Sequence, residues 1–117
     1  MENEDELDAI FFALSDRKRR SILTFLSEGP KSVGEIAVNF DLTLGAISKN
    51  IKIMEDARLI YKSKRGRFVY CHMNYDIWHN VAKFIAMHAQ FWSSRLDELD
   101  VYIETMKNPG APYDQHR

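Results

Sequence analysis

Apolar residues recur at helical spacing in the middle of the chain, most clearly between residues 43 and 57. Ile47, Ile51 and Met54 form one stripe there, which predicts an amphipathic helix over 43–57. Thr43 is the expected N-cap, because its hydroxyl can accept from a free N–H group of the first turn. Small, polar and cationic side chains then face outward, namely Ala46, Ser48, Lys49 and Lys52.

Two shorter apolar patterns precede this helix. Residues 7–14 predict a short helix, and residues from Arg17 to about Ser27 predict a second one with Asp16 as its N-cap. Gly29, followed by Pro30, is expected to end the second helix.

A third helix is predicted from the spacing Ser32-x-x-Glu35, which is typical of a capping box. This helix is expected to end near Asn39, and a short turn then leads to Thr43. Two short helices joined by a tight turn, the second with a polar outer face, predict a helix-turn-helix.

Two alternating segments follow directly, at 59–63 and 68–73, and predict a β-hairpin with Gly66 in its turn. A hairpin after a helix-turn-helix is a wing, here assigned to 61–73. Lys64, Arg65 and Arg67 crowd its tip, and because like charges repel, an external anion explains them better than an ordinary polar tip. Strand alternation places Cys71 on the inner face with Val69 and Met73, as a small core residue.

The segment 75–107 contains no glycine or proline and carries a heptad pattern of apolar residues. It predicts one long helix, or two with a joint near Ser93-Ser94. Three short helices cannot cover a helix of this length, so a second copy of the chain is the expected cover. The predicted dimer interface consists of Trp78, Ile85, Ala89, Trp92, Leu96, Leu99 and Ile103.

The expected organisation is a mainly α winged helix-turn-helix domain over 7–107, whose C-terminal helix, 75–107, is the dimerisation helix. Residues 1–6 are acidic, and 108–117 are rich in proline and polar residues, so both ends are expected to be disordered. With 117 residues, no run of 18 apolar residues and an acidic start unlike a signal peptide, a cytoplasmic protein is expected.

Charge is distributed unevenly although the net charge is only −1. Between Arg17 and Arg67 there are 12 Lys/Arg and 5 Asp/Glu, whereas the two flanks are acidic. This pattern favours one surface that meets a polyanion, although chance clustering would also produce it. Four cations at Arg17–Arg20 oppose the dipole of their own helix, so they indicate either phosphate contacts or a solvated basic turn.

Several short motifs in this order resemble the ArsR/SmtB family of winged-helix repressors. Phe12 to Asp16 with Arg19-Arg20 is similar to the family's "ALSDPTRRxIL", and Leu42 to Met54 is similar to "LSxxTVSxHLKxL". Ala57 to Ile60 resembles "AGLV", and Arg65 to Tyr70 resembles the wing "xGRxVYY". The last helix looks like that of a non-metal branch with an extended C-terminal helix.

The family's metal ligands are missing from the matching positions. Its Cys-x-Cys pair falls on Ser32 and Gly34, and its other site falls on Asn74, Asp76, Met87 and Gln90. Zinc and similar ions require thiolates or imidazoles in close geometry. His79 and His88 lie nine residues apart and face different sides of a helix, so no metal and no cofactor are expected.

The resulting hypothesis is a homodimeric repressor that binds a near-palindromic site on double-stranded DNA. The recognition helix 43–57 would enter the major groove, and the wing would contact the adjacent backbone or minor groove. The residues expected to contact DNA are Arg19, Arg20, Lys31, Thr43, Leu44, Ala46, Ser48, Lys49, Asn50, Lys52, Lys64, Arg65 and Arg67.

Other functions remain as alternatives to this hypothesis. The same basic surface could bind an acidic protein, which would make the domain a protein-interaction module. An enzyme is not expected, because no nucleophile–base pair, glycine-rich phosphate loop or pair of carboxylates in an apolar pocket is recognisable. An apolar effector pocket lined by Trp78, Trp92 or Phe84, or an intersubunit disulfide at Cys71, is conceivable, but dimer core and burial are the simpler interpretations.

Overall fold

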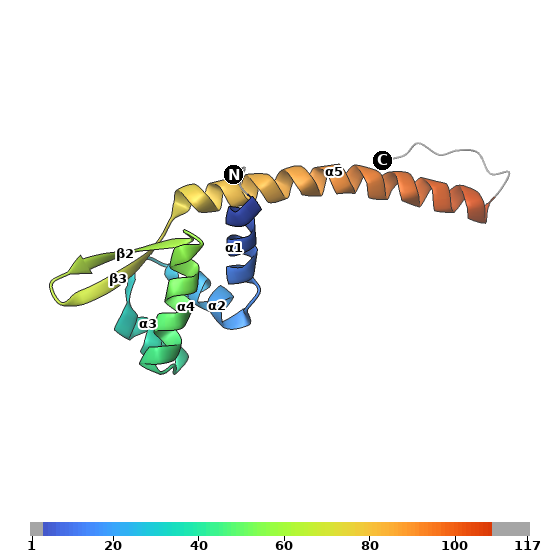
Figure 1. Ribbon diagram of the computed structural model, residues 1–117. Helices are drawn as coiled ribbons and strands as arrows, with labels where there is room; N and C mark the ends of the chain where they lie inside the picture. The colour runs from blue at the N-terminus through green and yellow to red at the C-terminus, as the bar shows by residue number, and fades with distance from the viewer. Residues whose placement is uncertain (1–3, 109–117) are drawn as a thin grey trace. The chain divides into compact units, whose positions relative to one another are not determined.

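The computed structural model describes residues 4–108, which form five helices and three strands (Figure 1). The chain divides into two compact units, the first ending at Val81 and the second beginning at Ala82. In chain order the elements are α1 (Glu4–Leu14), α2 (Arg17–Leu26), β1 (Lys31–Ser32), α3 (Val33–Phe40), α4 (Leu44–Asp56), β2 (Ile60–Arg65), β3 (Phe68–Met73) and α5 (Tyr75–Lys107).

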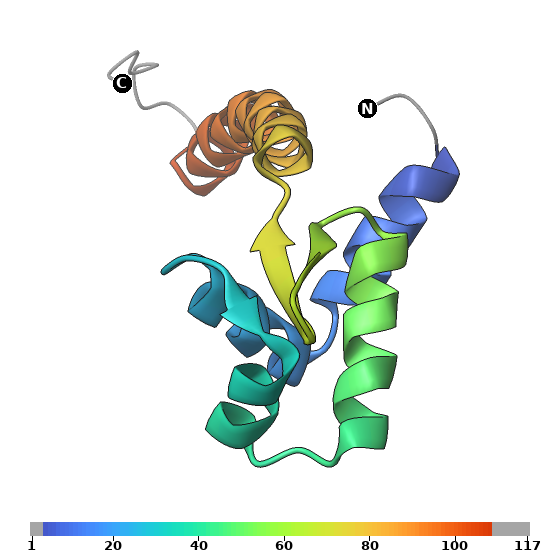
Figure 2. The ribbon, with the colours of Figure 1, turned by 90° about the vertical axis from the view of Figure 1, so that its left-hand side faces the viewer.

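The first unit is a winged helix-turn-helix built around a three-stranded antiparallel sheet. The strand order is β1-β3-β2, so the central strand is β3. Helices α2 and α3 contact β3, while α4 contacts β2 and α1 (Figure 2). The predicted hairpin is confirmed, but β1 was not predicted, because two residues, Lys31 and Ser32, are too few to show an alternating pattern.

One core joins these elements, and it contains residues from every helix and from both longer strands. The predicted stripe of α4 is confirmed, since its three residues are buried. The side chains that are almost fully buried are Ile10, Ala13, Ile22, Leu26, Ile36, Ile47, Met54, Leu59, Ile60 and Cys71. Burial of Ile47 and Met54 fixes the rotation of α4 about its axis, which decides which residues remain outside.

Side-chain caps begin α2, α3 and α4 as the sequence predicts. Asp16 Oδ2 accepts from Arg19 N at 3.1 Å, and this hydrogen bond holds the pKa of the Asp16 carboxyl below its usual value. Thr43 Oγ1 accepts from Ala46 N at 3.1 Å.

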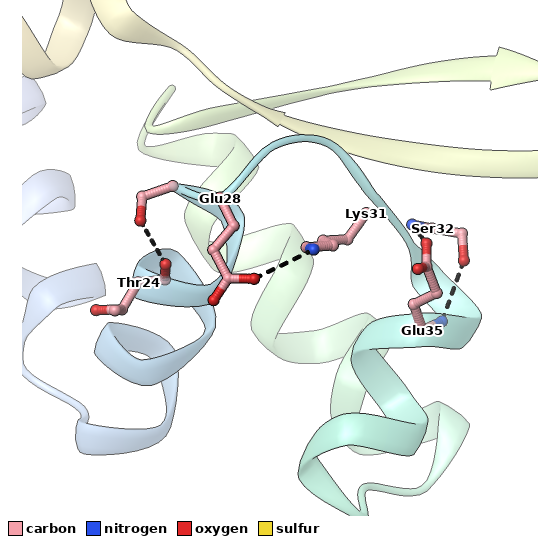
Figure 3. Close-up of polar contacts among 6 residues, drawn as sticks. Thr24, Glu28, Lys31, Ser32 and Glu35 are labelled. Atoms are coloured by element: carbon pink, nitrogen blue, oxygen red, sulfur yellow. Dashed lines mark hydrogen bonds and ion pairs between the residues drawn. The ribbon is translucent and has the colours of Figure 1, made fainter.

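The capping box at α3 is complete (Figure 3). Glu35 N donates to Ser32 Oγ at 3.1 Å, and Ser32 N donates to Glu35 Oε1 at 2.8 Å. The bond from the Ser32 N–H lowers the pKa of the Glu35 carboxyl, because it stabilises the charged form.

Several predicted boundaries need correction. Residues 4–6 belong to α1, because three acidic side chains in its first turn interact favourably with the helix dipole. Ser27, rather than Gly29, is the C-cap of α2, and α3 continues to Phe40 before Asp41 adopts a left-handed conformation at φ 53°. Asn108, the first residue of the predicted disordered tail, donates its N–H to Glu104 O at 3.0 Å. The rest of the predicted disordered ends, 1–3 and 109–117, lies outside the described residues.

Helix α5 runs without a break through Ser93-Ser94, so the single-helix alternative holds. Its first turns belong to the first unit, where Val81 is buried and Trp78 is half-buried. Trp78, which was predicted to lie in a dimer interface, also packs within its own domain, where its Nε1 donates to Leu59 O at 3.1 Å.

From Ala82 onward, α5 exposes its apolar residues. The heptad positions Ile85, Trp92, Leu96, Leu99 and Ile103 are between 40 and 57% exposed. None of the helices in residues 4–108 is long and apolar enough to cross a membrane.

Replacing Ser32 with alanine is expected to lower the free energy of unfolding by about 1 kcal/mol, because α3 loses the acceptor for its Glu35 N–H group. Urea unfolding followed by circular dichroism measures the change. Ser21→Ala, at an exposed position inside α2, is the matched control and should leave stability unchanged or slightly higher. Equal stability of wild type and Ser32→Ala would show that the capping box contributes nothing.

Candidate nucleic-acid interface

Helix α4 presents a polar and basic face opposite its buried stripe. Ser48, Lys49 and Lys52 are exposed, Ala46 is half-buried, and Leu44 is 70% exposed at the start of the helix. Lys52 Nζ lies 3.4 Å from Asp56 Oδ1, an exposed pair one turn apart that is weak in water. The cations of α4 are therefore available to an external anion.

The wing places three more cations close together. Arg65 pairs with Phe68 across the hairpin, which leaves Gly66 and Arg67 as the two-residue turn. Gly66 has φ 63°, the left-handed conformation predicted for it. Lys64 is exposed, and the guanidinium groups of Arg65 and Arg67 lie over the rings of Tyr70 and Phe68, at 5.4 Å and 5.9 Å.

A hollow of about 350 Å³ lies between the start of α3, helix α4 and the wing. Its lining includes Ser48 from α4 and Lys62 and Arg67 from the hairpin. Lys62 is a functional candidate that was not predicted, although alternation along β2 places it on the same face as Ile60 and Lys64. Its Nζ also lies 3.3 Å from Glu55 Oε1, so the pair tethers the wing to α4.

Arg19 does not belong to this surface, although the sequence predicted a phosphate contact for it. The residue is only 7% exposed, and its Nε and Nη2 donate to Ala13 O and Phe12 O, both at 2.9 Å. Its Nη1 donates to Asn50 Oδ1 at 3.2 Å. All three nitrogens of the guanidinium therefore donate to groups of the same domain.

Arg20 and Lys31 also make contacts within the chain. Arg20 Nη1 donates to Leu14 O at 2.7 Å, although the residue is exposed. Lys31 Nζ lies 3.4 Å from Glu28 Oε1 (Figure 3) and 4.5 Å from the centre of the Phe25 ring.

Contacts with the end of α1 explain two of the four cations at the start of α2, Arg19 and Arg20. Helix α1 has no basic residue in its last turn, and the last carbonyls of a helix have no partners within it. The two arginines donate to the carbonyls of Phe12, Ala13 and Leu14, and Phe12 O also accepts from Ser15.

Cys71 is buried in the core, as predicted, and pairs with Lys31 of β1 in the sheet. Loss of solvation raises the pKa of its thiol to about 11. Within residues 4–108, no group of three or more His, Cys, Asp and Glu side chains is arranged to hold a metal ion.

Comparison with known proteins places this geometry among bacterial regulators. Residues 16–62, from the cap of α2 into β2, match the family described as bacterial regulatory protein, arsR family. The transcriptional repressor SdpR of Bacillus subtilis is 34% identical over 68 residues, which cover 58% of this chain and 76% of SdpR.

Solved structures are similar as well. The crystal structure of an ArsR family transcriptional regulator, RHA00566, has a TM-score of 0.71 and 34% identity, and the match covers 80% of this chain and 96% of that one. A homodimeric winged helix-turn-helix DNA-binding domain from Mycobacterium bovis has a TM-score of 0.60 at 22% identity, covering 80% and 84% of the two chains, and so supports the fold.

The buried thiol of Cys71 is expected to resist modification. Because its pKa is raised from 9.0 to about 11, the thiolate fraction at pH 8 is about 100-fold smaller than in the unfolded chain. Ellman's reagent at pH 8 should therefore react at least about 100-fold more slowly with native protein than with protein in urea. The rate of this reaction with native protein should increase as the pH rises through about 11. Equal rates for native and urea-unfolded protein at pH 8 would contradict the burial of Cys71.

Proposed function

The chain belongs to the ArsR family of bacterial regulatory proteins and is a winged-helix, DNA-binding transcriptional regulator, and from this premise we propose that it acts as a homodimeric repressor of a near-palindromic operator. The observation that carries the proposal is the exposed basic face of α4 beside the cationic wing tip. SdpR, a similar protein, is itself named a transcriptional repressor.

In this proposal α4 enters the major groove. A groove about 12 Å wide admits an α-helix, and the small residues Ala46 and Ser48 allow a close approach to the bases. Lys49 and Lys52 contact phosphates or base acceptors, and the remaining contacts come from Thr43, Leu44 and Asn50. Few of these side chains can make bidentate base contacts, so part of the specificity comes from DNA shape.

The wing contacts the adjacent backbone or minor groove with Lys64, Arg65 and Arg67. Lys62 and Arg67 also line the hollow beside Ser48, which can receive the sugar-phosphate backbone. Arg20 and Lys31 remain candidates for phosphate contact, because each uses only part of its donor capacity within the chain. Arg19 is left out of the proposed contacts because its guanidinium is buried.

Dimerisation is proposed along the second unit. Exposed Ile85, Trp92, Leu96, Leu99 and Ile103 repeat every three or four residues on the continuous helix, together with Ala89. An apolar stripe of this length is typical of an interface, and a second copy supplies the same stripe. The similar domain from Mycobacterium bovis is described as homodimeric, which supports this choice of partner.

Alanine at Ser48, Lys49 and Lys52 together is expected to weaken duplex binding at least about tenfold, because each lost cation removes a phosphate or base contact. The duplex is first selected from a random pool with the wild-type protein and footprinted. With about six phosphates neutralised per dimer, log K for wild type should fall with log salt at a slope near −5. Fluorescence anisotropy measures both quantities.

The matched control is Lys83→Ala/Ser94→Ala/Lys107→Ala, which removes the same residue types from exposed positions of α5. This variant should bind the selected duplex like wild type. Unchanged binding by the α4 variant, or an affinity that does not depend on salt, would exclude the proposed contact surface.

Leu96→Asp is expected to convert a dimer at micromolar concentration into a monomer, because it places a charge in the apolar stripe. Sedimentation velocity measures the mass. Affinity for the full site should fall as well, since each monomer holds one half-site.

Ser94→Asp adds the same charge at an exposed position on the opposite side of the same helix and should remain dimeric. If wild type itself sedimented as a monomer at these concentrations, the proposed dimer would be wrong.

A further inference from the structure

The buried guanidinium of Arg19 links the recognition helix to the end of α1. Its three donor positions serve Ala13 O, Phe12 O and Asn50 Oδ1, at 2.9, 2.9 and 3.2 Å. The Phe12 ring lies 5.1 Å from the guanidinium carbon and adds a cation–π contact. The side chain is thus held from two helices, and Asn50 is its single contact on α4 among the hydrogen bonds of the described residues.

This contact fixes which way the Asn50 amide faces. A guanidinium has only donors, so the amide atom turned toward Arg19 has to be the oxygen. The NH2 group of Asn50 then faces away from Arg19. Within residues 4–108 that NH2 group has no acceptor, and no unpartnered side-chain nitrogen or oxygen is buried there, so the group is open to solvent.

Asn50 lies at the edge of the surface proposed to bind DNA. It follows Ala46 by four residues and therefore stands one turn farther along the same side of α4. Its neighbour Lys49 is fully outside, whereas Ile51 is buried. A donor at this edge can reach an acceptor on a duplex held against α4.

We propose that Arg19 is a positioning residue for DNA binding, which holds the Asn50 amide so that its NH2 group is presented as a hydrogen-bond donor to an oxygen or nitrogen acceptor on DNA. The proposal rests on the proposed placement of α4 against the duplex. In this proposal Arg19 does not touch DNA. It binds the Asn50 amide oxygen, and Asn50 therefore meets DNA with its NH2 group as a donor.

The deciding variant is Asn50→Asp. A carboxylate of the same shape still accepts from Arg19, so thermal unfolding should occur at the wild-type temperature or higher. The donor, however, is replaced by an anionic acceptor, and affinity for the selected duplex should fall at least about tenfold. Asn80→Asp, an exposed position on α5, makes the same change of charge and should bind within about twofold of wild type.

Asn50→His is the conservative counterpart. A neutral imidazole has one acceptor nitrogen and one N–H donor, so it can accept from Arg19 and still donate outward. Affinity at pH 8 should remain within about threefold of wild type. A residue that only joins α4 to α2 would show the reverse order, since Asp forms the stronger bond to Arg19.

Arg19→Lys tests the positioning itself. One ammonium group cannot serve three acceptors in different directions, so the amide of Asn50 becomes free to rotate. Affinity should fall, and the additional loss caused by Asn50→Asp should be smaller in the Arg19→Lys protein than in wild type. If Arg19→Lys does not fold, the comparison of Asn50→Asp with Asn50→His decides.

Two duplexes distinguish the source of the acceptor. If Asn50→Asp loses affinity equally for the selected site and for an unrelated duplex, the acceptor is a phosphate oxygen. If the loss of affinity is confined to the selected site, the acceptor is on a base. The proposal would be overturned if Asn50→Asp bound DNA like wild type. It would also be overturned if the affinity losses of Arg19→Lys and Asn50→Asp were additive in the double variant. Failure of wild type to bind any duplex at low salt would instead overturn the proposed function, and this inference with it.

Discussion

Burial of the α4 stripe is the constraint on which the rest of the structure depends. Ile47, Ile51 and Met54 are held in the core by contacts from α1, α3 and β2, so the helix cannot rotate about its axis. Because the stripe is fixed inside, Ser48, Lys49 and Lys52 are fixed outside. The outward placement of these three side chains on the proposed DNA surface is therefore a consequence of packing.

Polar contacts then fix what packing leaves free. The rotation of α4 does not by itself set the direction of the Asn50 amide. Arg19 sets it by donating to Asn50 Oδ1, and the ion pair Lys62–Glu55 at 3.3 Å joins the wing to α4. Arg19 itself is buried, so salt weakens its contacts less than it weakens the exposed ion pair of the wing.

Local signals made much of this fold predictable from sequence. The cap at Thr43, the box Ser32–Glu35 and the turn glycine Gly66 each act within four residues, so they can be recognised in the chain and are confirmed in the structure. The stripe of α4 is equally local, because helical spacing reveals it.

The features that could not be predicted depend on contacts between residues far apart in the chain. Arg19 donates to Asn50, 31 positions away, and Trp78 donates to Leu59 across 19 positions. A pattern of charges shows that four cations are crowded at the start of α2, but it does not show that two of them serve the carbonyls of the preceding helix. Strand β1 was missed for the same reason, since only its partner β3 makes two residues a strand.

Charge distribution connects the two units in function. The chain as a whole carries −1, and its cations lie mainly between Arg17 and Arg67, so in the proposed mechanism only the surface of α4 and the wing attracts a duplex. A single domain offers only a few cations, and contacts of this kind weaken steeply with salt. In the proposed dimer, two domains joined through the apolar stripe of α5 would bind the second half-site at a high effective concentration, which would multiply the affinity without any new contact. In the proposed mechanism the basic surface of one domain and the apolar stripe of α5 are thus complementary, because dimerisation compensates for the small number of cations that each domain offers.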